Sequence, residues 1–239
     1  MKVGILNNCT PYEEEEFRQS EFESFAQFLQ QVPHEFELRE YRVTEGELPA
    51  EPAECDAYLL TGSPTGVYDE VDWIAPLSDF VRQAYADGQK MVGICFGHQL
   101  LAHALGGHAE KSEKGWGIGR REAAIVSQKP WMTPALDLSN LYFCHQDQVL
   151  SLPPEAELLG TNEFCPNMMF AIGDQVLATQ AHPEFTDETM GKAVDYFRNK
   201  LPADFIAAAA ATIVPHATDS QTLAHWIINF LKQEREATD

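Results

Sequence analysis

The stretch MVGICFGHQLLAHALGG, residues 91–107, predicts a buried strand that turns abruptly into a helix. Cys95 stands at the turn, between Gly93 and Gly97, in the spacing of a nucleophile elbow. Such a turn lifts the central side chain above the sheet, and the glycines keep neighbouring backbone away from it. The positive end of the following helix also stabilises a thiolate. The pattern therefore indicates a reactive cysteine, with a buried structural cysteine as the alternative.

Strand and helix patterns alternate on the N-terminal side of this turn. Short apolar strands are expected over 2–8, 35–43, 56–62 and 90–94, and helices over 13–31 and 71–88. This alternation is typical of a parallel sheet that is covered by helices on both faces. The helix after Cys95 is expected to end in a left-handed turn at Gly106 or Gly107.

The C-terminal side of the turn has a different pattern. Between about residues 108 and 180 the apolar runs are short and separated by turn residues, which favours an antiparallel extension of the sheet. Helical patterns return after residue 186. We therefore predict an α/β fold with a mostly parallel sheet, flanking helices and an antiparallel extension. One domain is expected over residues 1–239, with a core over about 1–200 and a helical C-terminal extension over about 203–236.

Composition excludes several classes of partner. The formal net charge is −21, from 16 basic and 37 acidic residues, and so acidic a chain repels nucleic acids and anionic membrane surfaces. Five widely spaced cysteines without a CxxC pair argue against a disulfide framework and a zinc site. The apolar N-terminal run is too short for a signal segment, and no apolar run is long enough for a bilayer. A cytoplasmic protein without metal or cofactor is expected.

A cysteine nucleophile needs a base, and the segment VLATQAHPEF, residues 176–185, offers one. His182 and Glu184 are two residues apart, a spacing that places both on one side of an extended segment. Pro183 favours that extended geometry at His182. Glu184 can then hold one imidazole nitrogen, as the carboxylate of a catalytic triad does. A strand end with a polar cap is the alternative for this segment alone.

With these residues in place, the chain resembles the class I glutamine amidotransferases. The segments GICFGHQLLAHALGG (93–107) and AHPEF (181–185) are similar to the two signature motifs of that family. The resemblance implies a flavodoxin-like fold, with Cys95 as the nucleophile, His182 as the general base and acid, and Glu184 as its orienting partner. It also implies that Gln99 contacts the substrate. The amide of Phe96, directly after the nucleophile, is expected to stabilise an oxyanion.

Two further segments carry the resemblance. The loop in LLTGSPTGVYD (59–69) is similar to the family's loop that supplies the second oxyanion amide, here from Gly62 or Ser63. The segment YFCHQDQVLSLPP (142–154) resembles one in the amidotransferase domain of GMP synthase and in free-standing relatives. The resemblance implies that His145 and Gln146 bind the amino-acid end of the substrate. Asp147 is expected to meet an ammonium group or to hold the loop.

Three functions follow. The first is a hydrolase that cleaves a γ-glutamyl amide, in glutamine or in a γ-glutamyl peptide, through a cysteine thioester. The second is a glutaminase subunit that serves a separate synthetase, such as GMP synthase. The third is a non-catalytic amidotransferase-like binding protein. The chain contains no P-loop motif, which favours the first function over the second.

Overall fold

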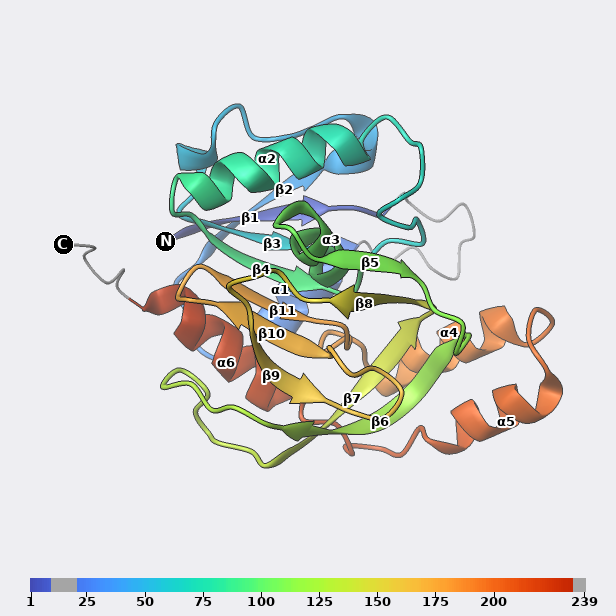
Figure 1. The fold of residues 1–239 in the computed structure, drawn as a ribbon. Helices are drawn as coiled ribbons and strands as arrows, with labels where there is room; N and C mark the ends of the chain where they lie inside the picture. The colour runs from blue at the N-terminus through green and yellow to red at the C-terminus, as the bar shows by residue number, and fades with distance from the viewer. Residues whose placement is uncertain (10–20, 234–239) are drawn as a thin grey trace.

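The computed structural model describes residues 1–9 and 21–233, and a mixed sheet of nine strands lies at its centre (Figure 1). Five neighbouring strands of this sheet run parallel to one another. In spatial order they are β2 (Glu37–Arg42), β1 (Lys2–Asn7), β3 (Ala57–Leu60), β4 (Lys90–Ile94) and β11 (Val176–Thr179). Two short 3₁₀ turns, Val43–Glu45 and Pro52–Glu54, follow β2. The predicted parallel sheet is therefore present.

The antiparallel extension is also confirmed. It continues the sheet beyond β11 through β10 (Met169–Ile172), β9 (Glu157–Thr161), β6 (Gly117–Ile125) and β7 (Leu138–His145). A separate two-stranded ribbon, β5 (His108–Lys111) with β8 (Asp147–Ser151), was not expected from the sequence. Its strands are short and polar, so they lack the apolar alternation that marks a strand.

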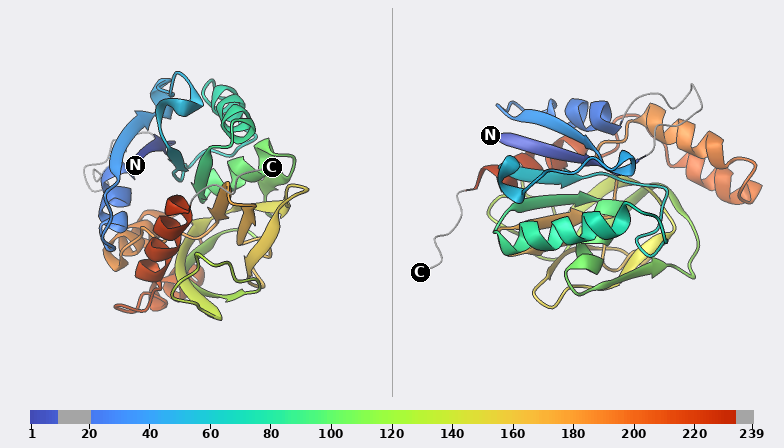
Figure 2. Two further views of the ribbon diagram at one scale, coloured as in Figure 1. Left: turned by 90° about the vertical axis from the view of Figure 1, so that its left-hand side faces the viewer. Right: turned by 90° about the horizontal axis from the view of Figure 1, so that it is seen from above.

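Six helices surround the sheet in the described part of the chain. Helix α1 (Glu21–Leu29) packs beside α6 (Ser220–Lys232), and α2 (Ile74–Ala86) packs beside α3 (Phe96–Ala104). Figure 2 shows α1 and α2 on opposite faces of the sheet. Helices α4 (Asp187–Phe197) and α5 (Ala203–Ala211) form a pair at one end of the molecule. The first part of the helix expected over 13–31 lies outside the described residues.

Alternation along the strands supplies two apolar cores. Successive side chains point to opposite faces of a sheet, so Leu59 of β3 packs on the α1 and α6 side, whereas Leu60 packs on the α2 and α3 side. Helix α6 contributes seven buried apolar side chains, which are Leu223, Ala224, Trp226, Ile227, Ile228, Phe230 and Leu231. The C-terminal helix is therefore part of the core. No helix within the described ranges is long and apolar enough to cross a membrane.

The antiparallel strands curl back toward the parallel ones. At the end of β11 the His182 amide donates a hydrogen bond to the Tyr142 carbonyl of the edge strand β7, at 2.8 Å. The Tyr142 hydroxyl donates to Asp187 Oδ1 at the start of α4, at 2.7 Å. These two bonds bring β7 and α4 to the carboxyl ends of the parallel strands, the edge where α/β sheets bind ligands.

Helix α3 begins in close contact with β3. The Gly97 amide donates to the Thr61 carbonyl at 3.1 Å, and a Cβ atom at Gly97 would lie 2.4 Å from the Leu60 carbonyl oxygen. No side chain fits there without moving backbone. The two glycines around Cys95 also face one another, because a Cβ at Gly93 would lie 2.6 Å from the Gly97 carbonyl group. The helix can therefore approach the sheet this closely only with glycine at both positions. Gly106, with φ +99°, follows the end of α3 in the left-handed region, as expected.

Gly97→Ala is expected to lower the free energy of unfolding by about 1–3 kcal/mol, because the new methyl group overpacks the contact with β3. Urea denaturation followed by circular dichroism measures this. Gly191→Ala in α4 is the matched control, since nothing lies within 4 Å of its added Cβ. This control is expected to raise stability by about 0.5–1 kcal/mol. Equal unfolding midpoints for the two variants would contradict the packing argument.

Candidate active site

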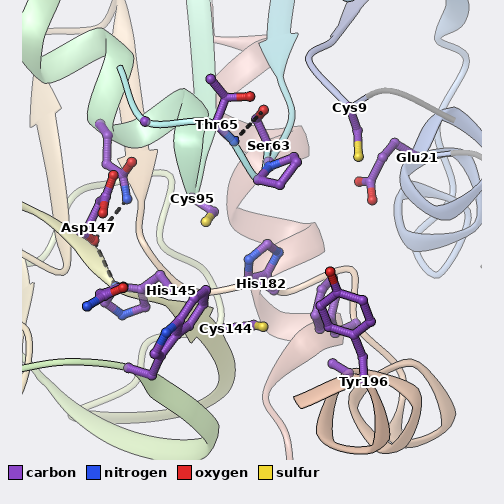
Figure 3. Close-up of a pocket in the computed structure, with 18 of the residues that line it drawn as sticks. Cys9, Glu21, Ser63, Thr65, Cys95, Cys144, His145, Asp147, His182 and Tyr196 are labelled. Carbon is purple, nitrogen blue, oxygen red and sulfur yellow. Dashed lines mark hydrogen bonds between the residues drawn. The ribbon is translucent and has the colours of Figure 1, made fainter. Parts of the chain in front are cut away.

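Cys95 occupies a strained backbone position at the junction of β4 and α3. Its φ is +53° and its ψ is −101°, a region that non-glycine residues rarely adopt. Strain of this kind costs about 1–3 kcal/mol and persists only where the surroundings enforce it. Here the Cys95 amide is held by the Thr179 carbonyl of β11 at 2.9 Å. The expected sharp corner is therefore present, and it directs the thiol into a cavity (Figure 3).

His182 and Glu184 lie together beside this thiol. The His182 Nδ1 atom is 2.6 Å from Glu184 Oε1, and both residues are only 6% exposed. Because an ionised carboxylate can only accept, Nδ1 donates and Nε2 is left for the Cys95 side. A Cβ at Gly62 would lie 3.2 Å from His182 Cε1 and 3.8 Å from Cys95 Cβ. His182 and Cys95 therefore both lie next to Gly62. The structure thus brings together the three residues predicted to act as a triad.

Electrostatics favour a charged imidazole at this point. Burial opposes the charge on His182, but the neighbouring Cys95 and Glu184 side chains outweigh it and raise the pKa of His182 well above its ordinary value of 6.5. The Phe185 ring stacks on the imidazole, with 4.1 Å between ring centres. A second carboxyl, Glu21, faces the same cavity, and burial together with Glu184 raises its pKa to about 7.

The loop after β3 has a fixed peptide orientation. Asn8 holds Thr61 from two sides, through its amide to Thr61 Oγ1 at 2.9 Å and its side chain to the Thr61 carbonyl at 3.2 Å. The Thr61 hydroxyl in turn donates to the Gly62 carbonyl at 3.1 Å. Because the peptide is planar and trans, the Ser63 amide points away from that hydroxyl. Both Gly62 and Ser63 line the cavity.

The predicted substrate contacts lie on one side of Cys95. The Gln99 side-chain amide donates to the Asp147 carbonyl at 3.0 Å and to Gln180 Oε1 at 3.1 Å. His145 Nδ1 donates to the same Asp147 carbonyl at 2.9 Å. Gln99, His145 and Gln146 all line the cavity, but the NH₂ group of Gln99 is already engaged in holding the loop. A polar contact between Gln99 and the substrate would therefore have to use the side-chain oxygen Oε1.

His145 presents a buried acceptor. Burial lowers its pKa to about 3, so the ring is neutral. Since Nδ1 donates to Asp147, Nε2 carries a lone pair, and within the described part of the chain it has no hydrogen-bond partner. Among the described residues, no group of three or more His, Cys, Asp or Glu side chains could hold a metal ion.

Several cavity residues were not anticipated. Tyr68 and Asp69 belong to the loop segment 59–69 already noted, and polar residues that follow a parallel strand are candidates on position alone. Glu21 of α1 and Tyr196 of α4 also line the cavity. Their sequence surroundings show only ordinary helical spacing. No local signal marks them, because the closure of the sheet and the packing of α1 bring them to the site.

The comparisons with known proteins identify the family of the chain. The family model of class-I glutamine amidotransferases matches residues 16–201. The γ-glutamyl peptidase 3 of Arabidopsis thaliana is 32% identical over 204 residues, which cover 80% of this chain and 81% of the peptidase. The GMP synthase of Aquifex aeolicus is 33% identical over 135 residues, 56% of this chain but only 25% of the synthase.

Solved structures show the same fold. A glutamine amidotransferase from Thermotoga maritima superimposes with a TM-score of 0.78 at 19% identity, over 97% of this chain and 98% of that one. One from Methylobacillus flagellatus gives a TM-score of 0.66 at 21% identity, over 99% of this chain and 97% of that one. On the family match, which spans most of the sequence, the chain belongs to the class I glutamine amidotransferases.

Proposed function

We propose that this protein is a γ-glutamyl hydrolase that works through a covalent cysteine intermediate. The observation that carries the proposal is the cluster of Cys95 on its strained corner, His182 beside it and Glu184 at 2.6 Å from the imidazole. The similarity to γ-glutamyl peptidases over four-fifths of both chains supports the γ-glutamyl group as the acyl part of the substrate. The proposal also includes a cytoplasmic location and a single domain over residues 1–239.

The proposed chemistry has two steps. The Cys95 sulfur attacks the γ-carbonyl carbon, and the carbonyl oxygen takes the negative charge. The protonated His182 donates its Nε2 proton to the departing nitrogen, which breaks the amide bond and leaves a γ-glutamyl thioester. Water, deprotonated by the now neutral His182, then attacks the thioester and releases glutamate. Glu184 keeps the imidazole oriented throughout.

Ser63, rather than Gly62, is the better second oxyanion donor. The Thr61 carbonyl accepts from Gly97 at the start of α3, so the Gly62 amide, on the opposite edge of that peptide, points away from α3. The Phe96 amide lies in the first turn of α3 and has no partner within the helix. The Ser63 amide points away from the buried Thr61 hydroxyl. We therefore assign the oxyanion to the amides of Phe96 and Ser63.

The amino-acid end of the γ-glutamyl group fits the side of the cavity that holds Gln99 and His145. Asp69 and Asp147 are available there for the α-ammonium group, and Lys111 for the α-carboxylate. Burial raises the pKa of Asp147, while the neighbouring Tyr68 hydroxyl and Lys111 favour its charged form.

A glutaminase subunit that serves a separate synthetase is the second candidate. The similarity to part of the GMP synthase of Aquifex aeolicus favours it. The two candidates differ in autonomy, because a hydrolase turns over γ-glutamyl peptides alone, whereas a partnered glutaminase needs its synthetase. Release of glutamate from γ-glutamyl dipeptides by the purified chain distinguishes them.

Cys95→Ala is expected to lower glutamate release from a γ-glutamyl dipeptide by about 10⁴-fold or more, because the nucleophile is removed. A coupled glutamate assay on the purified chain measures this. Cys165→Ala is the matched control, since that thiol is fully buried outside the cavity and burial raises its pKa to about 12. The control should retain activity. Equal rates for the two variants would refute the covalent mechanism.

Glu184→Gln is expected to lower kcat/KM by about 10²–10⁴-fold and to move the alkaline limb of its pH profile to lower pH. The carboxylate is one of the two groups that raise the pKa of His182, so its removal lowers that pKa, and His182 loses its proton at lower pH. A pH series of kcat/KM measures the shift. Glu157→Gln, which removes an exposed charge on β9, is the control and should leave the profile in place. An unmoved alkaline limb in Glu184→Gln would argue against His182 as the proton donor.

A further inference from the structure

The cavity extends to both sides of Cys95 and His182. Its volume is about 530 Å³, within the range of roughly 300–1,000 Å³ that is typical of pockets for drug-sized ligands. Figure 3 shows Asp147 and His145 on one side of the Cys95 thiol, and Glu21 and Tyr196 on the other side, beyond His182. The proposed γ-glutamyl contacts occupy the first side only. Within the described part of the chain, the second side is therefore left for the other part of the substrate.

The second side has an aromatic wall. Its members, which we call the α4 wall, are Trp116, Phe185, Tyr196 and Phe197, with Ala193 between them. The Trp116 and Phe197 rings lie 4.5 Å apart between centres, and Tyr196 is 41% exposed. Residues 196 and 197 follow residue 193 by three and four positions, so both lie beside it on the surface of α4. Partly exposed aromatic side chains that line a cavity favour an apolar ligand.

The wall is fixed in place by packing behind it. Trp116, Phe185 and Phe197 contact a buried apolar cluster between α4, α5 and the strands β6 and β7. The α4 helix is further tied to β7 by the hydrogen bond from Tyr142 to Asp187. The wall is therefore a preformed surface, so an apolar group can bind against it without the cost of ordering a loop.

The side of the cavity on which the leaving group departs is set by His182. A proton donor must reach the departing nitrogen directly, so the leaving amine lies on the His182 side of Cys95. Phe185, stacked on the His182 ring, joins that position to the α4 wall. The substituent on the leaving nitrogen thus extends along the wall.

Among the residues that the structure describes, few side chains on this side are polar. They are Glu21, Ser24, Thr189 and Lys192, and Lys192 is paired with Glu188 at 2.8 Å. The pKa of Glu21 is raised to about 7, so its carboxyl is partly neutral at physiological pH. Ammonia, the leaving group of glutamine, would leave the aromatic wall uncovered.

We infer that the α4 wall is the subsite for the leaving group, and that the preferred substrates are γ-glutamyl amides of amines with an apolar or aromatic side chain. This inference rests on the proposed γ-glutamyl hydrolase function and specifies its substrate class. Glutamine and γ-glutamylglycine, which place nothing on the wall, are poorer substrates.

The test compares kcat/KM for γ-L-glutamyl-L-phenylalanine, γ-L-glutamylglycine and L-glutamine. The phenylalanine compound is expected to exceed the glycine compound by about 10- to 100-fold, the range for an apolar group in a pocket. Tyr196→Ala, which removes part of the wall, and Ala193→Phe, which fills the space in front of it, are each expected to lower this ratio by about tenfold. Tyr196→Phe keeps the ring and should keep the ratio. Arg198→Ala, at the exposed end of α4 outside the cavity, should leave all rates unchanged.

The outcomes separate the two proposals. Cys95-dependent hydrolysis of all three compounds at similar rates would overturn the leaving-group subsite but support the hydrolase. A preference for the phenylalanine compound that survives both Tyr196→Ala and Ala193→Phe would also overturn the subsite. Loss of the preference in both variants, with retention in Tyr196→Phe, would support it. Absence of hydrolysis of any compound would overturn the hydrolase proposal and this inference with it. Calorimetric binding of the two dipeptides to Cys95→Ala compares their ground-state affinities without catalysis, and tighter binding of the phenylalanine compound is expected there as well.

Discussion

The strained backbone at Cys95 is the constraint on which the rest of the site depends. A non-glycine residue at φ +53° persists only where its neighbours leave no alternative. Here the neighbours are two glycines, Gly93 and Gly97, which let α3 approach the sheet until a single added carbon would clash with backbone. The same close approach places the Phe96 amide and the helix dipole at the thiol. The close packing at Gly93 and Gly97 thus determines the electrostatic surroundings of the Cys95 thiol.

The bridge between the edge strand β7 and the segment that follows β11 is the second constraint. The parallel strands alone supply Cys95, the loop at Gly62 and the end of β11, but they form only a part of the cavity. The backbone bond between His182 and Tyr142 brings β7 to this edge, and with it the loop that contains His145. The bond from Tyr142 to Asp187 anchors α4 as well. One residue of the edge strand therefore connects the imidazole, the polar side of the cavity and the aromatic side.

The two sides of the cavity have different chemistry for a physical reason. The side near Gln99 and His145 is built from loop backbone and from strand ends, where polar groups must find partners. The other side is built from the face of α4, whose apolar residues already pack on β6 and β7. The proposed substrate, which has a zwitterionic end and an apolar end, matches this division.

The sequence by itself determined the features that depend on short spacing. The strand, turn and helix around Cys95, the end of α3 at Gly106 and the pairing of His182 with Glu184 all follow from residues within a few positions of one another. The alternating class of the fold follows from the same local patterns. Only the tertiary structure decided the orientation of the loop at Thr61, because Asn8, which follows β1, and Gly97 of α3 bond to Thr61 from distant parts of the chain. It also brought Glu21 and Tyr196 to the cavity, since their places depend on long-range packing that no local pattern encodes.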